Sequence, residues 1–172
     1  MRKFIPLLML SSALHASLAH ADLATGFAAA ENLDFATALK EWRPLAAKGD
    51  ATAQFNLGVL YSKGQGVPQD YSQAAAWFRK AADQRDFRGQ SALGYLYYKG
   101  RGVERNYTLA FNYFSKAAGQ DFPVAQFRLA VMYQDGQGIT KNPSQALIWY
   151  RKAAEQGNAE AQLNLEPVRD LF

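Results

Sequence analysis

The sequence predicts an all-α protein, an α-solenoid built from repeated antiparallel helix pairs. The first observation is a repeat, because the stretch from Ala53 to Ala82 recurs 36 residues later and again after a further 36 residues. The second is that apolar residues in each copy recur at the three- and four-residue spacing of a helix face. A period of this length is typical of helical units that stack into a solenoid, and it decides the fold class.

Residues 1–21 have the pattern of a cleavable secretory signal peptide. Two basic residues follow the initial methionine, then comes a short apolar run, and Ala19-His20-Ala21 supplies the small-residue exit before Asp22. A membrane anchor is the alternative, but the apolar run is shorter than a bilayer requires. We therefore expect a single mature domain over residues 22–172 that is periplasmic or secreted and has no stable membrane insertion.

Composition excludes several classes of function. Without residues 1–21 the chain has 17 basic and 15 acidic residues, spread along its length, which is not the basic patch of a nucleic-acid-binding protein. There is no cysteine, and both histidines, His15 and His20, precede the expected cleavage site. A Ser-His-Asp triad, a Cys-His dyad and an ordinary zinc site are thereby excluded from the mature chain. We expect no cofactor and no metal.

The first helix pair is expected to span Leu23 to about Lys48. Small and apolar side chains recur there at helical spacing, and Asn32-Leu33-Asp34 interrupts the pattern, with Asp34 placed to cap the second helix. Pro44 falls inside that second helix and removes one of its hydrogen bonds. We therefore expect a kink near residue 40.

Each full repeat begins with a helix that has a packing stripe on one side. Gly49 and Asp50 introduce the first of these helices, from Ala51 to about Lys63. The stripe contains a glutamine, a leucine, a small residue and a tyrosine, and the small residue lets a neighbouring helix approach closely. The stripe residues are Gln54, Leu57, Gly58 and Tyr61, then Gln90, Leu93, Gly94 and Tyr97, then Gln126, Leu129, Ala130 and Tyr133.

A loop with the pattern Gly-x-Gly followed by Val or Ile comes after each of these helices. A phosphate cradle is the alternative interpretation, but no third glycine follows and no strand precedes. We expect the glycines to take positive φ in a turn whose Val or Ile returns to the core. The loops are closed by the capping residues Asp70, Asn106 and Asn142, and the second helices are expected to begin near Tyr71, Tyr107 and Pro143.

These units resemble Sel-one-like repeats, a branch of the tetratricopeptide-like helical repeats that has a longer, glycine-containing loop. The resemblance rests on the A-x-x-LG-x-x-Y run, the G-x-G-V/I loop and the Y/P-x-x-A-x-x-W/Y-F/Y-x-K-AA run, and it covers about Phe35 to Leu165. It implies a right-handed α-solenoid. The expected units are about residues 35–70, 71–106, 107–142 and 143–172, preceded by a partial unit at 22–34. Proteins of this kind are usually adaptors or scaffolds, and secreted bacterial relatives are associated with envelope processes and host contact.

The chain departs from the family pattern at two joints and lacks the cysteines of one branch. Arg85 to Gly89 replaces the usual G-[DN]-A-x-A turn, and Gly119 to Pro123 varies it, so these joints are expected to differ in angle or to have local contacts. A cysteine-rich secreted branch is credited with β-lactam binding, which a chain without cysteine does not support. Glu166-Pro167 is expected to end the last helix, and Leu171-Phe172 to cover its open end.

A second face of the first helix in each unit is the predicted binding site. It lies about 110 degrees round from the packing stripe, and the tetratricopeptide-like arrangement would place it on the concave surface. Apolar and aromatic side chains dominate this face, and the alternative is that neighbouring units bury part of it. The predicted partner-binding residues are Phe55, Val59, Ser62, Lys63, Tyr95, Tyr98, Lys99, Phe127, Val131 and Gln134.

The sequence favours a non-enzymatic protein–protein interaction module, a scaffold or adaptor of the bacterial cell envelope that binds a peptide or protein segment in its concave groove. Nucleic acid is not an expected partner. The alternative is a protein that binds or processes cell-wall glycan, for which a carboxylate pair or a Ser/Lys arrangement could act. Tyr98, Asp135 and Glu160 are candidate residues for that alternative.

Overall fold

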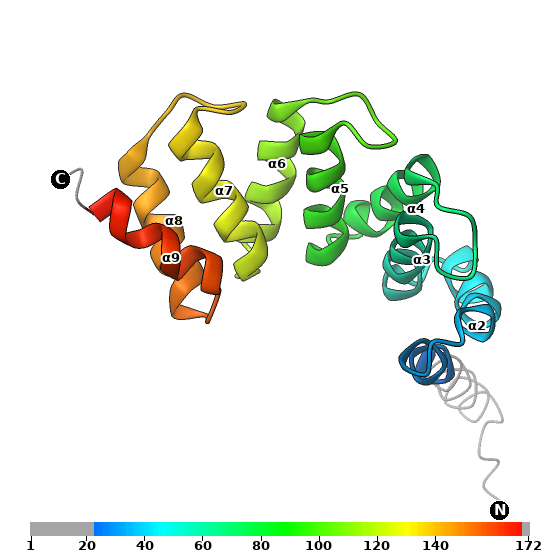
Figure 1. Ribbon diagram of the computed structural model, residues 1–172. Coiled ribbons are helices and arrows are strands. Elements are labelled where there is room, and N and C mark those ends of the chain that lie inside the picture. Colours follow the sequence, from blue (N-terminus) through cyan, green and yellow to red (C-terminus); the bar gives the residue numbers. More distant parts are fainter. Residues whose placement is uncertain (1–22, 170–172) are drawn as a thin grey trace, which may run out of the picture.

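The computed structural model describes residues 23–169, and every regular element in this range is a helix (Figure 1). A first helix covers residues 23–31. The others are α2 (Phe35–Ala47), α3 (Ala51–Lys63), α4 (Tyr71–Asp83), α5 (Phe87–Lys99), α6 (Tyr107–Ala118), α7 (Pro123–Asp135), α8 (Pro143–Glu155) and α9 (Ala159–Arg169). The predicted signal peptide at residues 1–21 and the predicted cap at Leu171-Phe172 lie outside the described residues. None of the described helices is both long and apolar enough to cross a bilayer.

The helices follow one another along a curved array in which successive helices run in opposite directions (Figure 1). The most extensive contacts join α3 to α4, α5 to α6 and α7 to α8, and each of these pairs is connected by one of the long loops. The loops lie along the outer edge of the array (Figure 1). The structural unit is thus one helix, a long loop and a second helix, and the predicted all-α solenoid of antiparallel helix pairs is confirmed.

Helices begin at the predicted capping residues. Asp50, for example, accepts a hydrogen bond from the backbone N–H of Ala53 at 2.7 Å, which satisfies one of the unpaired donors at the start of α3. The N-cap of α7 is Phe122, which has no side-chain acceptor, and there Pro123 occupies the first turn, where a missing N–H requires no partner. Side-chain caps of the Asp50 kind are also made by Asp34, Asp70, Asp86, Asn106 and Asn142.

The two glycines of each long loop have different tasks, although both take the predicted positive φ. The first ends the preceding helix, as Gly100 does with a φ of 67°. The second packs on the previous unit, and a Cβ built on Gly102 would lie 2.2 Å from the carbonyl carbon of Tyr71 at the start of α4. Gly138 approaches Tyr107 in the same way, at 2.4 Å. The loop is therefore a contact between units as well as a turn.

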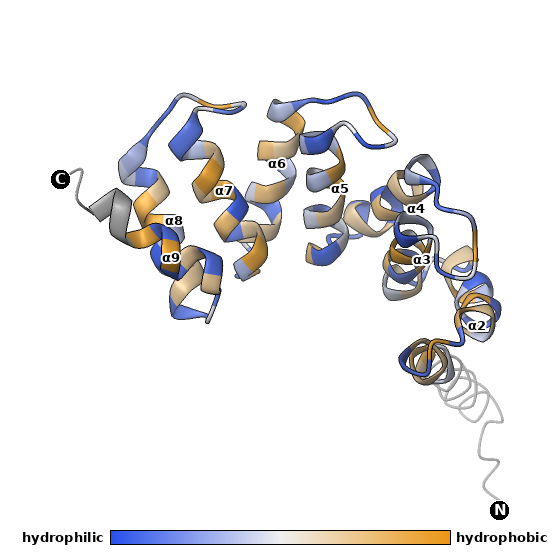
Figure 2. Ribbon diagram, in the orientation of Figure 1, coloured by the Kyte–Doolittle hydropathy of each residue, from blue (hydrophilic) through white to orange (hydrophobic). Residues whose placement is uncertain are grey.

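An aromatic ring from the second helix holds each pair together. Phe78, Phe114 and Tyr150 occupy corresponding positions and are at most 3% exposed. The ring of Phe78 fills the space beside Gly58, where an added Cβ would lie 2.5 Å from a ring carbon. This contact explains the small residue in the predicted packing stripe. Figure 2 shows both hydrophobic and hydrophilic residues on these helices, as expected for helices that bury one side.

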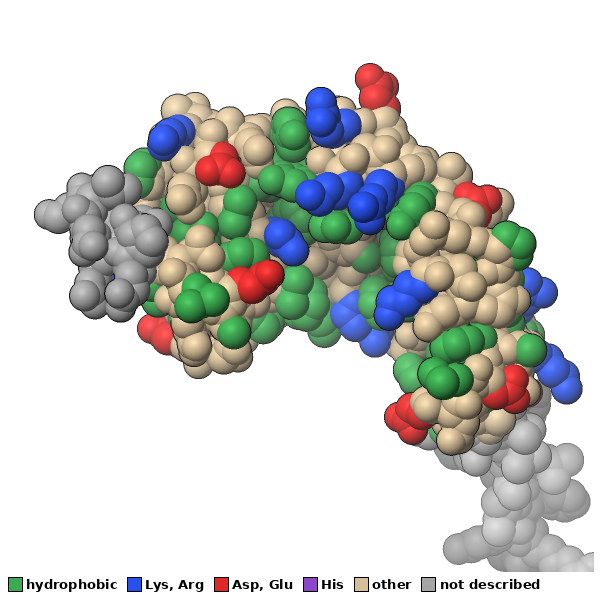
Figure 3. Space-filling model, in the orientation of Figure 1, with side chains coloured by type: hydrophobic (Ala, Val, Ile, Leu, Met, Phe, Trp, Pro, Cys, Tyr) green, Lys and Arg blue, Asp and Glu red, His purple; other side chains and the backbone are tan. Residues whose placement is uncertain are grey.

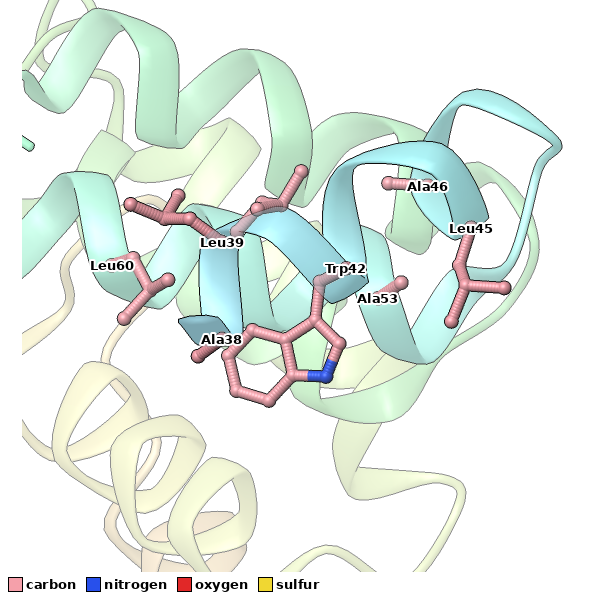
Figure 4. Packing of buried hydrophobic residues seen from close by; sticks show 8 residues of the cluster. Ala38, Leu39, Trp42, Leu45, Ala46, Ala53 and Leu60 are labelled. Carbon is pink, nitrogen blue, oxygen red and sulfur yellow. The ribbon is translucent and has the colours of Figure 1, made fainter. Parts of the chain in front are cut away.

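Trp42 in α2 anchors the N-terminal end of the array and is 3% exposed (Figure 4). Its indole Nε1 donates a hydrogen bond to the Leu23 carbonyl oxygen at 3.4 Å. The ring of Phe27 meets it edge-on at a centroid distance of 5.4 Å. A Cβ on Gly26 would lie 2.2 Å from Nε1, so the first helix can approach this closely only with glycine there. The predicted first helix pair is thus a packed part of the fold.

A repeated glutamine contact links successive units. The Nε2 of Gln90 donates to the carbonyl oxygen of Ala82 at the end of α4, at 3.4 Å, and its Oε1 accepts from Nε2 of Gln120 at 2.8 Å. Both contacts recur around Gln54 and Gln126. We call this row the glutamine spine, and it consists of Gln54, Gln90 and Gln126 with their partners Gln84, Gln120 and Gln156.

The joints between units all use a left-handed residue, including the two that depart from the family pattern. Gly49 and Gly157 have φ values of 98° and 83°, and the corresponding Arg85 and Asp121 have φ values of 65° and 59°. Left-handed backbone is unfavourable for residues with a side chain, by about 1–2 kcal/mol. Packing of the adjoining helices therefore holds Arg85 and Asp121 in a strained conformation.

Pro44 and Pro167, the prolines beyond the first turn of a helix in residues 23–169, are both expected to disturb it. α2 continues through Pro44 as far as Ala47, and the predicted kink near residue 40 stays a prediction. The prediction that Glu166-Pro167 ends the last helix is wrong, because α9 continues to Arg169. Pro167 removes a single hydrogen bond, to the carbonyl of Leu163, and that residue is 77% exposed, so water can reach the unpaired carbonyl.

Candidate functional site

Two adjoining hollows lie along α5. The first has a volume of about 440 Å³ and is formed by α3, α5, α6 and α7, and the second, of about 290 Å³, is formed by α3, α4, α5 and the loop after α5. They share Ala92 and Tyr95, so they form one continuous surface, which we call the α5 groove. Its residues are Phe55, Ser62, Lys63, Tyr71, Phe78, Phe87, Arg88, Ser91, Ala92, Tyr95, Leu96, Arg101, Phe114, Phe122, Val124 and Arg128.

Tyr95 stands at the centre of the α5 groove, where the two hollows meet, and its side chain is half-buried. The guanidinium carbon of Arg128 lies 5.7 Å from the centroid of its ring, and Nζ of Lys99 lies 6.0 Å from it. Distances of this size permit attraction between a cation and the face of an aromatic ring. One aromatic ring thus holds cations from α5 and α7 beside it.

Arg88 is held in place at one side of the first hollow. It pairs with the carboxylate of Asp86, which also caps α5, with 2.6 Å between the closest nitrogen and oxygen. Its guanidinium also donates to Oγ1 of Thr52 at 3.1 Å and lies 4.8 Å from the ring centroid of Phe55. The expectation that the joint at Arg85 to Gly89 has local contacts is thereby confirmed. Arg88 therefore belongs to the wall of the groove and is already neutralised there.

The first hollow has an apolar rim that solvent reaches. Phe87 and Phe122 meet with their ring centroids 4.9 Å apart. Phe87 is 38% exposed and Val124 is 44% exposed. Large apolar side chains that are exposed side by side in a concave surface are typical of a site that another molecule covers.

Arg128 and Arg101 give the groove its charge. Arg101 follows α5, and its guanidinium carbon lies 5.4 Å from the ring centroid of Tyr71. Arg128 is flanked by Phe127, at 5.3 Å, in addition to Tyr95. Among the groove residues Lys63, Arg88, Arg101 and Arg128 are basic and none is acidic. Figure 3 shows basic and hydrophobic side chains gathered over the middle of the molecule.

Of the ten predicted binding residues, four lie in the α5 groove. Phe55 and Tyr95 line the first hollow, and Ser62, Lys63 and Tyr95 line the second. Val59 and Lys63 line another hollow, of about 340 Å³, between α3 and the N-terminal helices. Since Lys63 belongs to both, this hollow adjoins the α5 groove. That these residues bind a partner stays a prediction.

The predicted residues of the third unit lie elsewhere. Phe127 is 6% exposed and packs against Tyr150 with ring centroids 5.8 Å apart. Gln134 accepts a hydrogen bond from the Tyr150 hydroxyl at 2.5 Å, and Val131 packs against the same cluster. Burial raises the pKa of Tyr150 to about 12. α8 therefore buries most of the predicted binding face in the third unit. Burial by a neighbouring helix is the alternative that the sequence left open.

Tyr98 and Lys99 complete the predicted set at the C-terminal end of α5. The ring of Tyr98 meets that of Tyr107 edge-on at 5.4 Å, so this tyrosine packs against α6. Nζ of Lys99 lies 5.3 Å from the centroid of Tyr98 and remains exposed. Neither residue lines the α5 groove.

Sequence reasoning missed Arg88, Val124 and Arg128. The first two lie on the predicted face, one helical turn before Ser91 and Phe127, and extension of that face toward the start of each helix would have found them. Arg128 occupies the position of Asn56 and Ala92 in the other units, and residues at this position line hollows in all three units. The predicted face did not include this position.

The α5 groove has groups that suit binding. Its polar groups are arginine, lysine, serine and tyrosine side chains, and among residues 23–165 no three acidic, histidine or cysteine side chains gather as they would around a metal. The candidate carboxylates for glycan chemistry, Asp135 and Glu160, do not line it. The geometry thus suits recognition through aromatic rings and cations.

A family model described as Sel1 repeat matches residues 51–86, 88–122 and 123–158. Its first two boundaries fall at the joints between the helix pairs, so the matched units start with α3, α5 and α7 and not with the helix after each long loop. None of the curated proteins matches the chain.

Solved structures share the fold. A Sel1 repeat protein from Oxalobacter formigenes is 33% identical with a TM-score of 0.78, over 83% of this chain and 58% of the other. The protein c5321, a protective antigen present in uropathogenic Escherichia coli strains, is 33% identical with a TM-score of 0.80, over 92% and 35%. Helicobacter pylori cysteine rich protein B, at 22% identity, has a TM-score of 0.59 over 74% and 92%, which shows likeness of fold alone. The chain thus spans less than two thirds of the first two proteins.

Proposed function

We propose that this chain, which belongs to the Sel1 repeat family, binds a segment of another protein in the α5 groove. Sel1 repeat proteins are generally protein-interaction modules. The stacked helices provide an extended concave surface, along which a segment of another protein can lie. We further propose that it acts as a scaffold or adaptor in the bacterial cell envelope.

The apolar rim of the α5 groove is the observation that carries the proposal. Phe87 and Val124 leave more than a third of their surface exposed, although both border a hollow whose lining is mostly apolar. Covering such a surface removes apolar area from water, and this is the main favourable contribution to most protein associations. Cations beside the rim would orient the partner.

Site-specific photo-crosslinking tests the proposal. A benzoylphenylalanine placed at Val124 should capture one identifiable protein in cells, and the same probe at Phe87 should capture that protein too. Ile148 in α8 is the matched control, because it is also 44% exposed and lies outside the groove. Equal capture at Val124 and Ile148 would count against the groove. A thermal shift with cell-wall glycan fragments, and no captured protein, would favour the glycan alternative.

The envelope location has a separate test. The pattern of residues 1–21 supports export with cleavage before Asp22. Mass spectrometry of the natively expressed protein should therefore find Asp22 at its N-terminus in a fraction outside the cytoplasm. An uncleaved chain in the cytosolic fraction would contradict export and leave the binding proposal untouched.

A further inference from the structure

We infer that the segment bound in the α5 groove is acidic and also has an apolar side chain. This inference rests on the proposed function and adds the chemistry of the partner. Three observations support it. Each arginine of the groove lies against an aromatic ring, two of the three have no acidic partner among the described residues, and the groove has a defined length along α5.

Each arginine of the groove is held against an aromatic ring that also lines it. Arg88 lies 4.8 Å from Phe55, Arg101 lies 5.4 Å from Tyr71, and Arg128 lies 5.7 Å from Tyr95, measured from guanidinium carbon to ring centroid. Stacking fixes the plane of a guanidinium and leaves the N–H groups at its edge available. These are the groups that grip a carboxylate with two parallel hydrogen bonds.

Two of these three arginines have no acidic partner. Among residues 23–165, whose side chains are described, the one ion pair joins Arg88 to Asp86. Among these residues no carboxylate is therefore within salt-bridge distance of Arg101, Arg128 or Lys63, all of which line the groove. A carboxylate from a partner would find a cation that stacking has already oriented, so little side-chain freedom is lost on binding.

The hollow between α3 and the N-terminal helices does not share this charge. Glu31 lines it together with Lys63, so the unbalanced positive charge is confined to the part along α5. Asn56 in α3 lines it too, but its unpartnered side-chain nitrogen is buried and is not available to a ligand.

The arrangement along α5 sets the length of the segment. The α5 residues that line the groove run from Phe87 to Leu96, and the helix rise separates these two by roughly 14 Å. An extended peptide of about four residues covers this distance. The apolar rim at Phe87, Phe122 and Val124 lies beside Arg128, and Arg101 lies past the other end of the helix. A segment with an apolar side chain at the rim and acidic residues facing Arg128 and Arg101 therefore matches the groove.

Peptide selection tests the inference without a known partner. A random peptide library displayed on phage would be panned against the full chain. We expect enrichment of peptides that combine acidic residues with an aromatic or large aliphatic residue. Affinities of selected peptides, measured by fluorescence polarisation, should weaken about tenfold or more in the Arg101→Gln and Arg128→Gln double variant, since each lost charge pair acts on a common ligand.

Arg105→Gln is the matched control. Its guanidinium carbon lies 5.5 Å from the ring centroid of Tyr107, so it is stacked like the others, but it does not line the groove. Affinity should change less than about twofold in this variant. Unfolding curves of all three proteins would show whether an effect comes from lost stability.

Several results would overturn the inference. Enrichment of basic or uncharged peptides would do so, as would unchanged affinity in the double variant. If a single-stranded oligonucleotide displaced the peptides and bound more tightly than they do, the natural ligand would be an anionic polymer and not a protein segment. If the selected peptides were not acidic but were lost on Tyr95→Ala, the proposed groove function would stand and only the charge inference would fall. If no peptide were selected and Val124 captured no protein, both would fall.

Discussion

At the scale of single residues, the same residue type has different tasks in different neighbourhoods. Gly100 and Gly102 are two positions apart and both have a φ of 67°, yet one ends a helix and the other touches the previous unit. A Cβ on Gly100 would lie 3.0 Å from Cβ of Arg105, a tight contact that a small shift relieves, whereas on Gly102 it would lie 2.2 Å from the backbone of Tyr71, which is a severe overlap. Conformation alone would make the two positions equally sensitive to substitution.

We predict that Gly102→Ala destabilises the protein more than Gly100→Ala. Both substitutions place a Cβ in left-handed backbone, at about 1–2 kcal/mol. Gly102→Ala adds a steric overlap with Tyr71, which is worth a further 1–3 kcal/mol or so. Urea unfolding followed by circular dichroism measures both variants. Equal losses would show that the loop moves away from α4 at no cost.

Tyr150 predicts a pH dependence at the C-terminal end of the array. Burial, and to a smaller extent the charge of Asp135, raises its pKa from 10.0 to about 12. The neutral phenol is therefore favoured in the fold, and its contribution to stability is fully present below pH 10 and is lost as the pH rises to about 12. Wild type should lose more stability than Tyr150→Phe between about pH 9 and about pH 11.5, as measured by urea unfolding. A parallel decline in both proteins would contradict this assignment.

At the scale of elements, the glutamine spine links each unit to the one before it. Gln90 is 4% exposed and joins the end of α4 to the turn after α6. A buried polar group that loses its partner is costly, so the two ends of one such hydrogen bond need not be equally sensitive. The spine therefore makes the stability of one unit depend on its neighbours.

We predict that Gln90→Ala is more destabilising than Gln120→Ala. Truncation of Gln90 removes two hydrogen bonds, which are worth about 0.5–1.5 kcal/mol each, although the Ala82 carbonyl keeps the bond from the Arg85 N–H. Truncation of the exposed Gln120 removes only one of them and lets water reach Oε1 of Gln90, so a loss of about 0.5–1.5 kcal/mol is expected. Chemical unfolding of the two variants decides the order. The reverse order would show that the exposed glutamine of the spine contributes more to stability than the buried one.

At the scale of the whole molecule, curvature brings residues of three helix pairs to one groove. Tyr95 and Tyr98 come from one helix and one predicted face, yet Tyr95 lies in the α5 groove and Tyr98 packs on Tyr107. The position of each residue relative to the neighbouring helices therefore separates binding from packing. Substitution of these two residues should have different effects.

We predict that Tyr95→Ala weakens capture of the partner by about 2 kcal/mol or more, as expected for a central aromatic anchor, with a smaller effect on the melting temperature. Tyr98→Ala should mainly lower the melting temperature, because it removes the contact with α6. Crosslinking yield at Val124 and thermal unfolding measure the two effects. Loss of capture in Tyr98→Ala alone would move the site to the C-terminal end of α5.

The sequence by itself determined the all-α solenoid, the positions of the helix caps, the left-handed loop glycines and the small residues of the packing stripe. These features depend on hydrogen bonds and backbone conformations within a few residues, and the sequence pattern that predicts each of them occurs in all three repeats. The tertiary structure decided which inner-face residues form the groove. α8 buries Phe127, and Arg101 and Arg128 turn onto rings of other helices. Such contacts join residues far apart in the chain at positions where the units differ, as at Asn56, Ala92 and Arg128, and so no local pattern could predict them.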